Sequence, residues 1–160
     1  LSNLINEYEP CADISIRASE LKGITLDPKL VPNLIDEMPV LFIASALAEG
    51  TTRIRGAQEL RFKESDRLES MARTLNLFGV KHKIFEDGID IKGVDQSEKD
   101  LPFKSAEIDS FGDHRIAMAS VIGALRSKDS CKVKNCSNIS TSFPGFIDLS
   151  NRIGIILNKI

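Results

Sequence analysis

Two segments of the sequence are apolar nearly all round, which is the pattern of helices buried on every face. Residues 38–49 (MPVLFIASALAE) are the first, and Gly50 is predicted to end the helix. The second runs from Ile116 to Leu125, inside a helix predicted at 113–127, and it is rich in small residues. Because other elements must cover two such helices, the rest of the sequence decides the fold class.

The remaining segments alternate between strand and helix patterns. Apolar and polar residues alternate at 12–18 (ADISIRA), which predicts a half-buried strand. Further strands are predicted at 51–56, 104–109 and 130–135, a hairpin at 80–93 turning at Asp87-Gly88, and further helices at 63–78 and 144–157. Strands that alternate with helices predict an α/β layer arrangement.

Length and charge narrow the class of protein. The 160 residues fit one domain or a piece of a larger one, and the start at Leu1 in place of Met suggests a cut edge. A net charge of −2 argues against a general binder of nucleic acid or of anionic membranes. No apolar run reaches the roughly 18 residues expected of a membrane span.

Cysteine and histidine usage predicts a reducing compartment without a zinc site. Cys11, Cys131 and Cys136 are odd in number and form no CxxC pair, which favours free thiols in a cytosol-like compartment. His82 and His114 are far apart in the sequence, so a zinc site has little support.

The segment RFKESDRL at 61–68 concentrates charge at a predicted helix start. Glu64 heads the apolar stripe of that helix, and Arg67 neighbours it. A carboxylate in the first turn gains about 0.3–1 kcal/mol from the helix dipole, whereas Lys63 and Arg67 are unfavourable there. A solvated face and an anion site both remain open, and Asp66 is expected to serve the first turn or a salt bridge.

Two further helix starts carry charge. Asp36 is expected outside a helix that begins at Pro39, where it is either a general base or a loop aspartate. Asp113, His114 and Arg115 open the second buried helix, and an arginine at that positive end is costly unless an anion joins it. Three charged helix starts predict convergence on one polyanionic ligand.

A fourth helix start and the histidine allow less specific readings. Ser140, Thr141 and Ser142 precede Pro144, an arrangement typical of helix capping and compatible with phosphate. His114 is either a base or a structural hydrogen-bonding histidine.

Four motifs, in order along the chain, resemble the 5-enolpyruvylshikimate-3-phosphate synthase family. They are DEMPVLFIASALAEGTTRIRGAQELR at 36–61, LRFKESDRL at 60–68, DSFGDHRIAMA at 109–119 and TSFPGF at 141–146. The resemblance implies an enolpyruvyl transferase-like α/β fold of two domains, each built from three βαβαββ units. Residues 1–160 would be the C-terminal portion, about two units of one domain, with the N-terminal half absent.

The resemblance also implies an activity in the shikimate pathway, which leads to chorismate and the aromatic amino acids. The enolpyruvyl group of phosphoenolpyruvate would pass to the 5-hydroxyl of shikimate 3-phosphate, with release of phosphate and no metal or organic cofactor. The intact enzyme would be a cytoplasmic monomer. Because several ligands would come from the N-terminal half, residues 1–160 alone are expected to be inactive.

Site roles follow from the same resemblance. Asp36 would contact the shikimate hydroxyls and act as the base for the attacking oxygen, and Lys63 would bind shikimate 3-phosphate. Glu64 would transfer a proton at the methylene carbon of phosphoenolpyruvate. Arg67 and Arg115 would hold its phosphate and carboxylate, which suits planar guanidinium groups.

Two positions depart from the pattern of some members. Glu59 stands where some have an asparagine that contacts the substrate, and Thr141 stands where some have a lysine. Substrate affinity and inhibitor sensitivity therefore stay open.

Two rival functions also stay open. One is the sister enolpyruvyl transferase acting on UDP-N-acetylglucosamine, which the KESDR and GDHR motifs disfavour. The other is a non-catalytic anion-binding domain, which would gain nothing from Asp36 and Glu64 beside its arginines.

Overall fold

The structure is a computed structural model that describes residues 2–5, 11–94 and 102–159. The strands are β1 (Ser2–Ile5), β2 (Cys11–Asp13), β3 (Thr51–Ile54), β4 (His82–Phe85), β5 (Gly88–Lys92), β6 (Glu107–Asp109) and β7 (Lys132–Lys134). The helices are η1 (Pro28–Leu30), α1 (Val31–Leu34), α2 (Met38–Ala46), η2 (Gln58–Phe62), α3 (Arg67–Leu77), α4 (His114–Ala124), α5 (Ile139–Ser142) and α6 (Phe146–Arg152).

Strand pairing confirms the α/β arrangement. β3, β5 and β4 form an antiparallel sheet in that order, and β6 pairs in parallel with β7. Residues 21–26 lie parallel to β3, because Gly23 N donates to Glu49 O at 2.7 Å and Arg53 N donates to Ile24 O at 2.7 Å. This segment, α2, β3, α3, β4 and β5 make one βαβαββ unit, and β6, α4 and β7 belong to a second.

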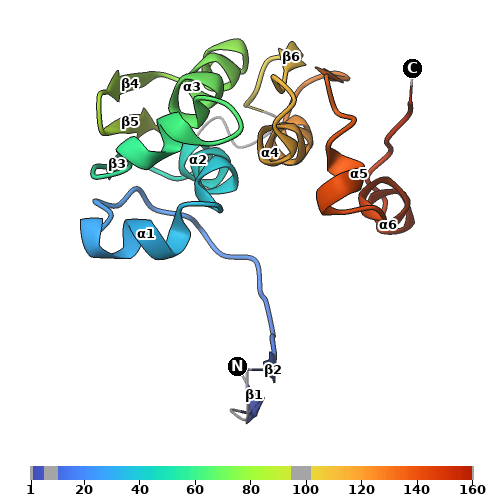
Figure 1. The fold of residues 1–160 in the computed structure, drawn as a ribbon, viewed down its shortest axis with the longest axis horizontal. Coiled ribbons are helices and arrows are strands. Elements are labelled where there is room, and N and C mark those ends of the chain that lie inside the picture. The colour runs from blue at the N-terminus through green and yellow to red at the C-terminus, as the bar shows by residue number, and fades with distance from the viewer. Residues whose placement is uncertain (1, 6–10, 95–101, 160) are drawn as a thin grey trace.

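The two apolar helices are buried, as the sequence predicts. α2 and α4 lie side by side in the middle of the molecule (Figure 1), and Phe42 and Ile116 from them join one hydrophobic core. Phe78 stacks on Phe103 in that core with ring centroids 4.9 Å apart. Aliphatic side chains of β3 and β5 complete the core, so the sheet and the helices share one interior.

Two helices start or end elsewhere than predicted. α2 ends at Ala46, three residues before the predicted end. α3 begins at Arg67 and not at residue 63, because Lys63 is extended at φ −88° and ψ −162° and Asp66 caps the helix. Gly79, at φ 81°, terminates α3 as predicted.

The predicted hairpin forms, with its turn shifted by one residue. Phe85 pairs with Gly88, so Glu86 and Asp87 are the loop and Gly88 opens β5. Glycine is needed there for close approach, since a Cβ at Gly88 would lie 2.0 Å from the Ile54 carbonyl oxygen.

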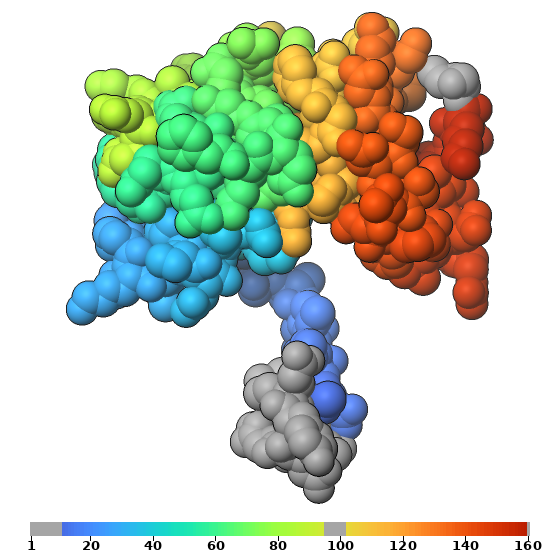
Figure 2. Space-filling view, viewed as in Figure 1, coloured from blue at the N-terminus to red at the C-terminus, as the bar shows by residue number. Residues whose placement is uncertain are grey.

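The strand predicted at 12–18 is wrong beyond Asp13. β2 ends there, and Ile14 and Ile16 are 71% and 87% exposed on an extended segment that projects from the body of the molecule (Figures 1 and 2). The alternating pattern needs a neighbouring sheet to bury its apolar face, and the described part of the chain places none beside it.

The C-terminal helix is also shorter than predicted. α6 spans Phe146–Arg152 in place of 144–157, and α5 precedes it as a separate short helix. Within residues 2–5, 11–94 and 102–159, the helices are all too short or too polar to cross a membrane.

Candidate active site

The first residues of α3 and α4 and the loop before α2 meet at one buried guanidinium. Arg67, the first residue of α3, is 1% exposed, and all three of its nitrogens donate to carboxylates. Nη1 donates to Asp36 Oδ1 at 2.9 Å, Nη2 to Glu64 Oε2 at 2.5 Å and Nε to Asp113 Oδ2 at 2.9 Å. These residues and Arg115 form the arginine–carboxylate cluster.

Arg115 joins the cluster through Asp36. Its Nη1 donates to the Asp36 carbonyl oxygen at 2.7 Å and to Glu37 Oε1 at 3.0 Å, and its Nη2 lies 3.5 Å from Asp36 Oδ2. The three predicted helix starts therefore lie together, and the polyanionic ligand on which they are predicted to converge stays a prediction. Carboxylates of the chain itself provide the anions that a buried helix start with an arginine requires.

Asp36 lies outside a helix, as predicted. It follows α1 in a turn, and α2 begins two residues later at Met38 with Pro39 in its first turn. The hydrogen bond from Arg67 lowers the pKa of Asp36 despite partial burial, and the charges of Arg115, Arg67 and Lys63 lower it further. Asp36 is therefore ionised at neutral pH.

Arg67 stays charged in spite of its burial. Desolvation acts to lower its pKa, but the hydrogen bond and charge of Asp113, the hydrogen bond of Asp36 and the charge of Glu64 outweigh it. The net effect raises the pKa of Arg67 above its ordinary value.

Glu64 reaches the cluster from a loop and not from the apolar stripe of a helix. It lies between η2 and α3, and its side chain is 50% exposed. Asp66 takes the helix-start role: it accepts from Glu69 N at 3.0 Å and pairs with Arg61 at 2.8 Å. Both functions expected of Asp66 are thus confirmed.

Lys63 lies next to the cluster and is held by another carboxylate. Its Nζ lies 2.5 Å from Glu59 Oε1, and its charge contributes to the lowered pKa of Asp36. The position that departs from some relatives, Glu59, therefore contacts the lysine predicted to bind substrate.

Asp113 is the site residue that the sequence did not single out for a role. It is fully buried and caps α4, and its Oδ1 accepts from Arg115 N at 2.9 Å. Ser65 Oγ donates to its Oδ2 at 3.1 Å. The signal that could have found it is an N-cap aspartate directly before an arginine at the start of an apolar helix.

Other candidate groups lie outside the arginine–carboxylate cluster. His114 is the first residue of α4 and is half-buried. The capping predicted before Pro144 is wrong: Ser140, Thr141 and Ser142 lie inside α5, and α6 begins after Gly145, which makes no side-chain cap. Ser140 Oγ donates to Ser137 O at 2.8 Å. Thr141 is exposed. The described ranges contain no group of three or more His, Cys, Asp or Glu placed to hold a metal.

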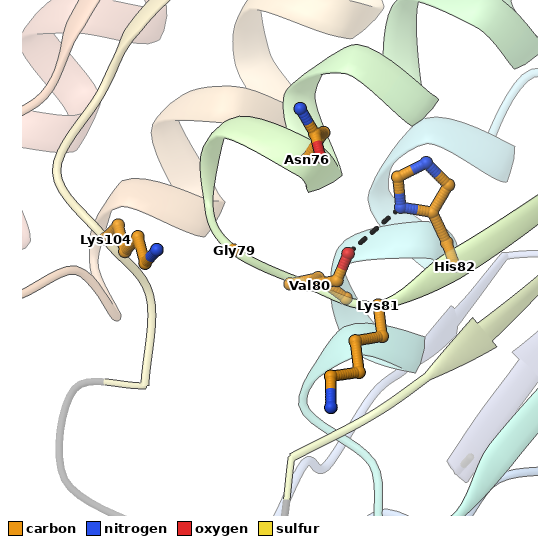
Figure 3. A pocket seen from close by; sticks show the side chains of 6 residues that line it. All are labelled: Asn76, Gly79, Val80, Lys81, His82 and Lys104. Carbon is orange, nitrogen blue, oxygen red and sulfur yellow. Dashed lines mark hydrogen bonds between the residues drawn. The ribbon is translucent and has the colours of Figure 1, made fainter.

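A separate hollow of about 440 Å³ lies at the opposite end of α3 (Figure 3). His82 Nδ1 lies 3.0 Å from the Val80 carbonyl oxygen on its wall. The lining residues are Asn76, Gly79, Val80, Lys81, His82 and Lys104. None of them belongs to the arginine–carboxylate cluster, so this hollow is distinct from the candidate site.

The βαβαββ unit and its parallel and antiparallel pairings make this an α/β protein, and structural neighbours place it in the enolpyruvyl transferase-like fold. An EPSP synthase solved from Acinetobacter baumannii superposes with a TM-score of 0.91 at 43% identity, covering 96% of this chain and 35% of that one. A second structure described as EPSP synthase from the same organism gives a TM-score of 0.90 at 40% identity, covering 99% of this chain and 36% of that one.

The sequence comparisons identify the family. The family model described as EPSP synthase (3-phosphoshikimate 1-carboxyvinyltransferase) matches residues 5–149, and the chain belongs to this family. The 3-phosphoshikimate 1-carboxyvinyltransferases of Magnetococcus marinus and Hydrogenovibrio crunogenus are each 47% identical over 152 residues, 95% of this chain and 33% of each relative. The chain thus spans about a third of the length of the curated relatives it matches.

Proposed function

We propose that this chain is the C-terminal part of a 3-phosphoshikimate 1-carboxyvinyltransferase. The enzyme transfers the enolpyruvyl group of phosphoenolpyruvate to the 5-hydroxyl of shikimate 3-phosphate and releases phosphate. The observation that carries the proposal is the buried guanidinium of Arg67, which joins Asp36 and Glu64 with Arg115 alongside. Two cations and two partly exposed carboxylates at one place suit a dianionic substrate that must also exchange protons.

The cations bind the substrates. Arg67 and Arg115 hold the phosphate and carboxylate of phosphoenolpyruvate, and Lys63 binds the phosphate of shikimate 3-phosphate. Planar guanidinium groups can bind such anions through two parallel hydrogen bonds and can spread the charge of a tetrahedral intermediate. Arriving substrate anions take the place of the carboxylates that pair with these cations.

The carboxylates move the protons. Asp36 takes the proton of the 5-hydroxyl as its oxygen attacks, and protonated Glu64 gives its proton to the methylene carbon. Glu64 recovers that proton when the intermediate collapses, and the proton on Asp36 leaves with the phosphate. When phosphoenolpyruvate engages Arg67, Asp36 loses the hydrogen bond that lowers its pKa most, while the charges of Arg115, Arg67 and Lys63 remain. Its pKa then rises toward the ordinary value, which makes it a stronger base during the reaction.

The remaining two thirds of the relatives' length supplies the rest of the site. The 160 residues alone are expected to show no turnover, because positioning two anionic substrates requires groups from both parts. The intact enzyme is proposed to be a cytoplasmic monomer that uses no metal or organic cofactor.

The test is a chimera in which this chain replaces the matching 152 residues of the Magnetococcus marinus relative. Phosphate release from phosphoenolpyruvate and shikimate 3-phosphate is measured for the chimera and for its Asp36→Ala and Glu64→Ala variants. Glu69→Ala is the matched control, since Glu69 pairs with Arg73 at 3.1 Å on the exposed face of α3.

Activity that Asp36→Ala and Glu64→Ala abolish and Glu69→Ala retains supports the proposal. A folded chimera that binds both substrates without turnover favours the anion-binding domain. Turnover with UDP-N-acetylglucosamine as acceptor, and none with shikimate 3-phosphate, favours the sister transferase.

A further inference from the structure

We propose that Asp113 is a positioning residue that fixes the two arginines of the site relative to each other. The inference rests on the proposed function, because it assigns Arg67 and Arg115 to the two charged ends of one substrate molecule. Asp113 touches neither substrate; it acts through the arginines.

The two oxygens of Asp113 serve the two arginines separately. Oδ1 accepts from the backbone N–H groups of Arg115 and Ile116, at 2.9 and 3.4 Å, which fixes the first turn of α4. Oδ2 accepts from Arg67 Nε at 2.9 Å and from Ser65 Oγ at 3.1 Å, which fixes the guanidinium at the start of α3. One buried carboxylate therefore sets the distance and angle between two helix starts.

Asp113 binds only the Nε of Arg67, which leaves Nη1 and Nη2 available to bind a substrate anion. Nε, the nitrogen nearest the backbone, is the one bound to the buried carboxylate, whereas Nη1 and Nη2 point to the half-exposed Asp36 and Glu64. A substrate anion can replace those two exposed partners while Asp113 keeps the guanidinium in place.

Two residues with positive φ directly before Asp113 form the turn that places its side chain. Phe111 and Gly112 are both left-handed, at φ 54° and 75°, a conformation that is strained for a non-glycine residue such as Phe111. Asp109 Oδ1 accepts from Phe111 N at 2.7 Å, and Asn138 Nδ2 donates to Gly112 O at 2.5 Å. Side chains from both sides of α4 thus hold the turn that places Asp113 between the arginines.

An amide cannot replace this carboxylate. Asparagine is as good an N-cap as aspartate, so Asp113→Asn can keep its oxygen on Arg115 N. Its NH₂ group would then face the Nε–H of Arg67, and two donors cannot bond to each other. If the amide flips, Arg67 regains its acceptor and α4 loses its cap. Either way, one of the arginines loses its fixed position.

The experiment compares Asp113→Asn with Asp66→Asn in the chimera. The two aspartates are matched: Asp66 also caps a helix, accepting from Glu69 N, and also pairs with an arginine, Arg61, at 2.8 Å. Asp113→Asn is expected to raise the KM for phosphoenolpyruvate about tenfold to a hundredfold, the effect of losing one hydrogen bond to a charged group. The KM for shikimate 3-phosphate, which depends on Lys63 and Asp36, should change less than about twofold, because the hydrogen bonds of Asp113 go to other residues. Asp66→Asn should leave both constants within that factor.

The split between the two KM values separates positioning from general damage to the fold. Equal rises in both constants, or equal effects of Asp113→Asn and Asp66→Asn, overturn the inference. If Asp113→Asn does not fold, Asp113→Ser serves in its place, since serine caps a helix and offers Arg67 no charge.

Failure of the proposed function is a distinct outcome. If the unsubstituted chimera shows no turnover, calorimetry of phosphoenolpyruvate binding to the same chimera replaces the KM. A dissociation constant that Asp113→Asn weakens and Asp66→Asn does not then supports the inference. Equal constants for the three proteins, or no binding by any of them, overturn it.

Discussion

Replacing Arg67 with methionine should destabilise the chain strongly, because it leaves the buried carboxylate of Asp113 without its positively charged partner. Asp113 is fully buried, and its Oδ2 lies 2.9 Å from Arg67 Nε. At that separation, an effective dielectric constant of about 20 gives an attraction of roughly 6 kcal/mol. The desolvation cost of the pair offsets part of it, so Arg67→Met is expected to lower the free energy of unfolding by about 3–5 kcal/mol.

Urea unfolding followed by far-UV circular dichroism measures this loss, and two variants control it. Arg73→Met removes an exposed arginine from the same helix, whose pair with Glu69 should contribute about 1 kcal/mol or less. The double variant Arg67→Met with Asp113→Asn removes the stranded charge and keeps the cap of α4. It should recover about 2 kcal/mol or more of the loss, since removing both partners of a buried pair is far milder than removing one.

Burial of an unpaired carboxylate is not the cause if Arg67→Met loses no more stability than Arg73→Met. The same conclusion follows if the double variant is as unstable as Arg67→Met alone.

Three further outcomes follow from the structure. Ser120 is fully buried on α4 with no hydrogen-bond partner for its hydroxyl among the described residues, so Ser120→Ala should raise the urea midpoint by the equivalent of about 1 kcal/mol; a lower midpoint would contradict this. Gly88→Ala should lower the free energy of unfolding, measured by thermal unfolding, by about 1–3 kcal/mol or more, because the new Cβ would meet backbone atoms of Ile54. Gly50→Ala is the control: its Cβ would have no atom within 4 Å, but its φ of 91° is strained for alanine, so it measures backbone strain without the contact. Folding lowers the pKa of Asp36, so this carboxylate stabilises the fold above its ordinary pKa of 3.8, and the stabilisation is lost as the pH falls through the lower folded pKa. The free energy of unfolding of Asp36→Asn, plotted against pH, should therefore change less than the parent's below about pH 4. Parallel plots for the two proteins would refute the assignment.

Sequence patterns located the starts of α2 and α4 to within one residue, because proline and capping signals are local. Proline placed the start of α2 to within one residue and left Asp36 outside the helix, although Met38, directly before Pro39, is already helical. Charge at the start of α4 indicated an anion requirement, which the structure satisfies with carboxylates from distant segments. Which carboxylates meet Arg67 depends on how α2, α3 and α4 pack, and no local pattern contains that.

The start of α3 shows where periodicity misled. Glu64 fits the apolar stripe by spacing, yet the cap at Asp66 begins the helix two residues after it. A capping aspartate competes with the helical conformation of the residues before it, and that local hydrogen bond outweighed the pattern. The displaced Glu64 is thereby free to turn toward Arg67.

The strand predicted at 12–18 was wrong beyond Asp13 for a different reason. Alternating apolar residues such as Ile14 and Ile16 are suited to face a sheet, but the pattern does not show whether a neighbouring strand is present. A strand forms only with a partner, so its existence depends on residues far from it in the sequence or outside the described chain.

The span of the Arg67 contacts sets an order of assembly. Its partners lie 31 positions before it and 46 positions after it, so a chain made from its N-terminus exposes the guanidinium long before Asp113 leaves the ribosome. The ion pair can close only after α4 is synthesised and docked, which makes it a late step with a high loop-closure cost. A chain cut anywhere between Arg67 and Asp113 would place them on separate pieces, and the formation of this pair would then depend on protein concentration.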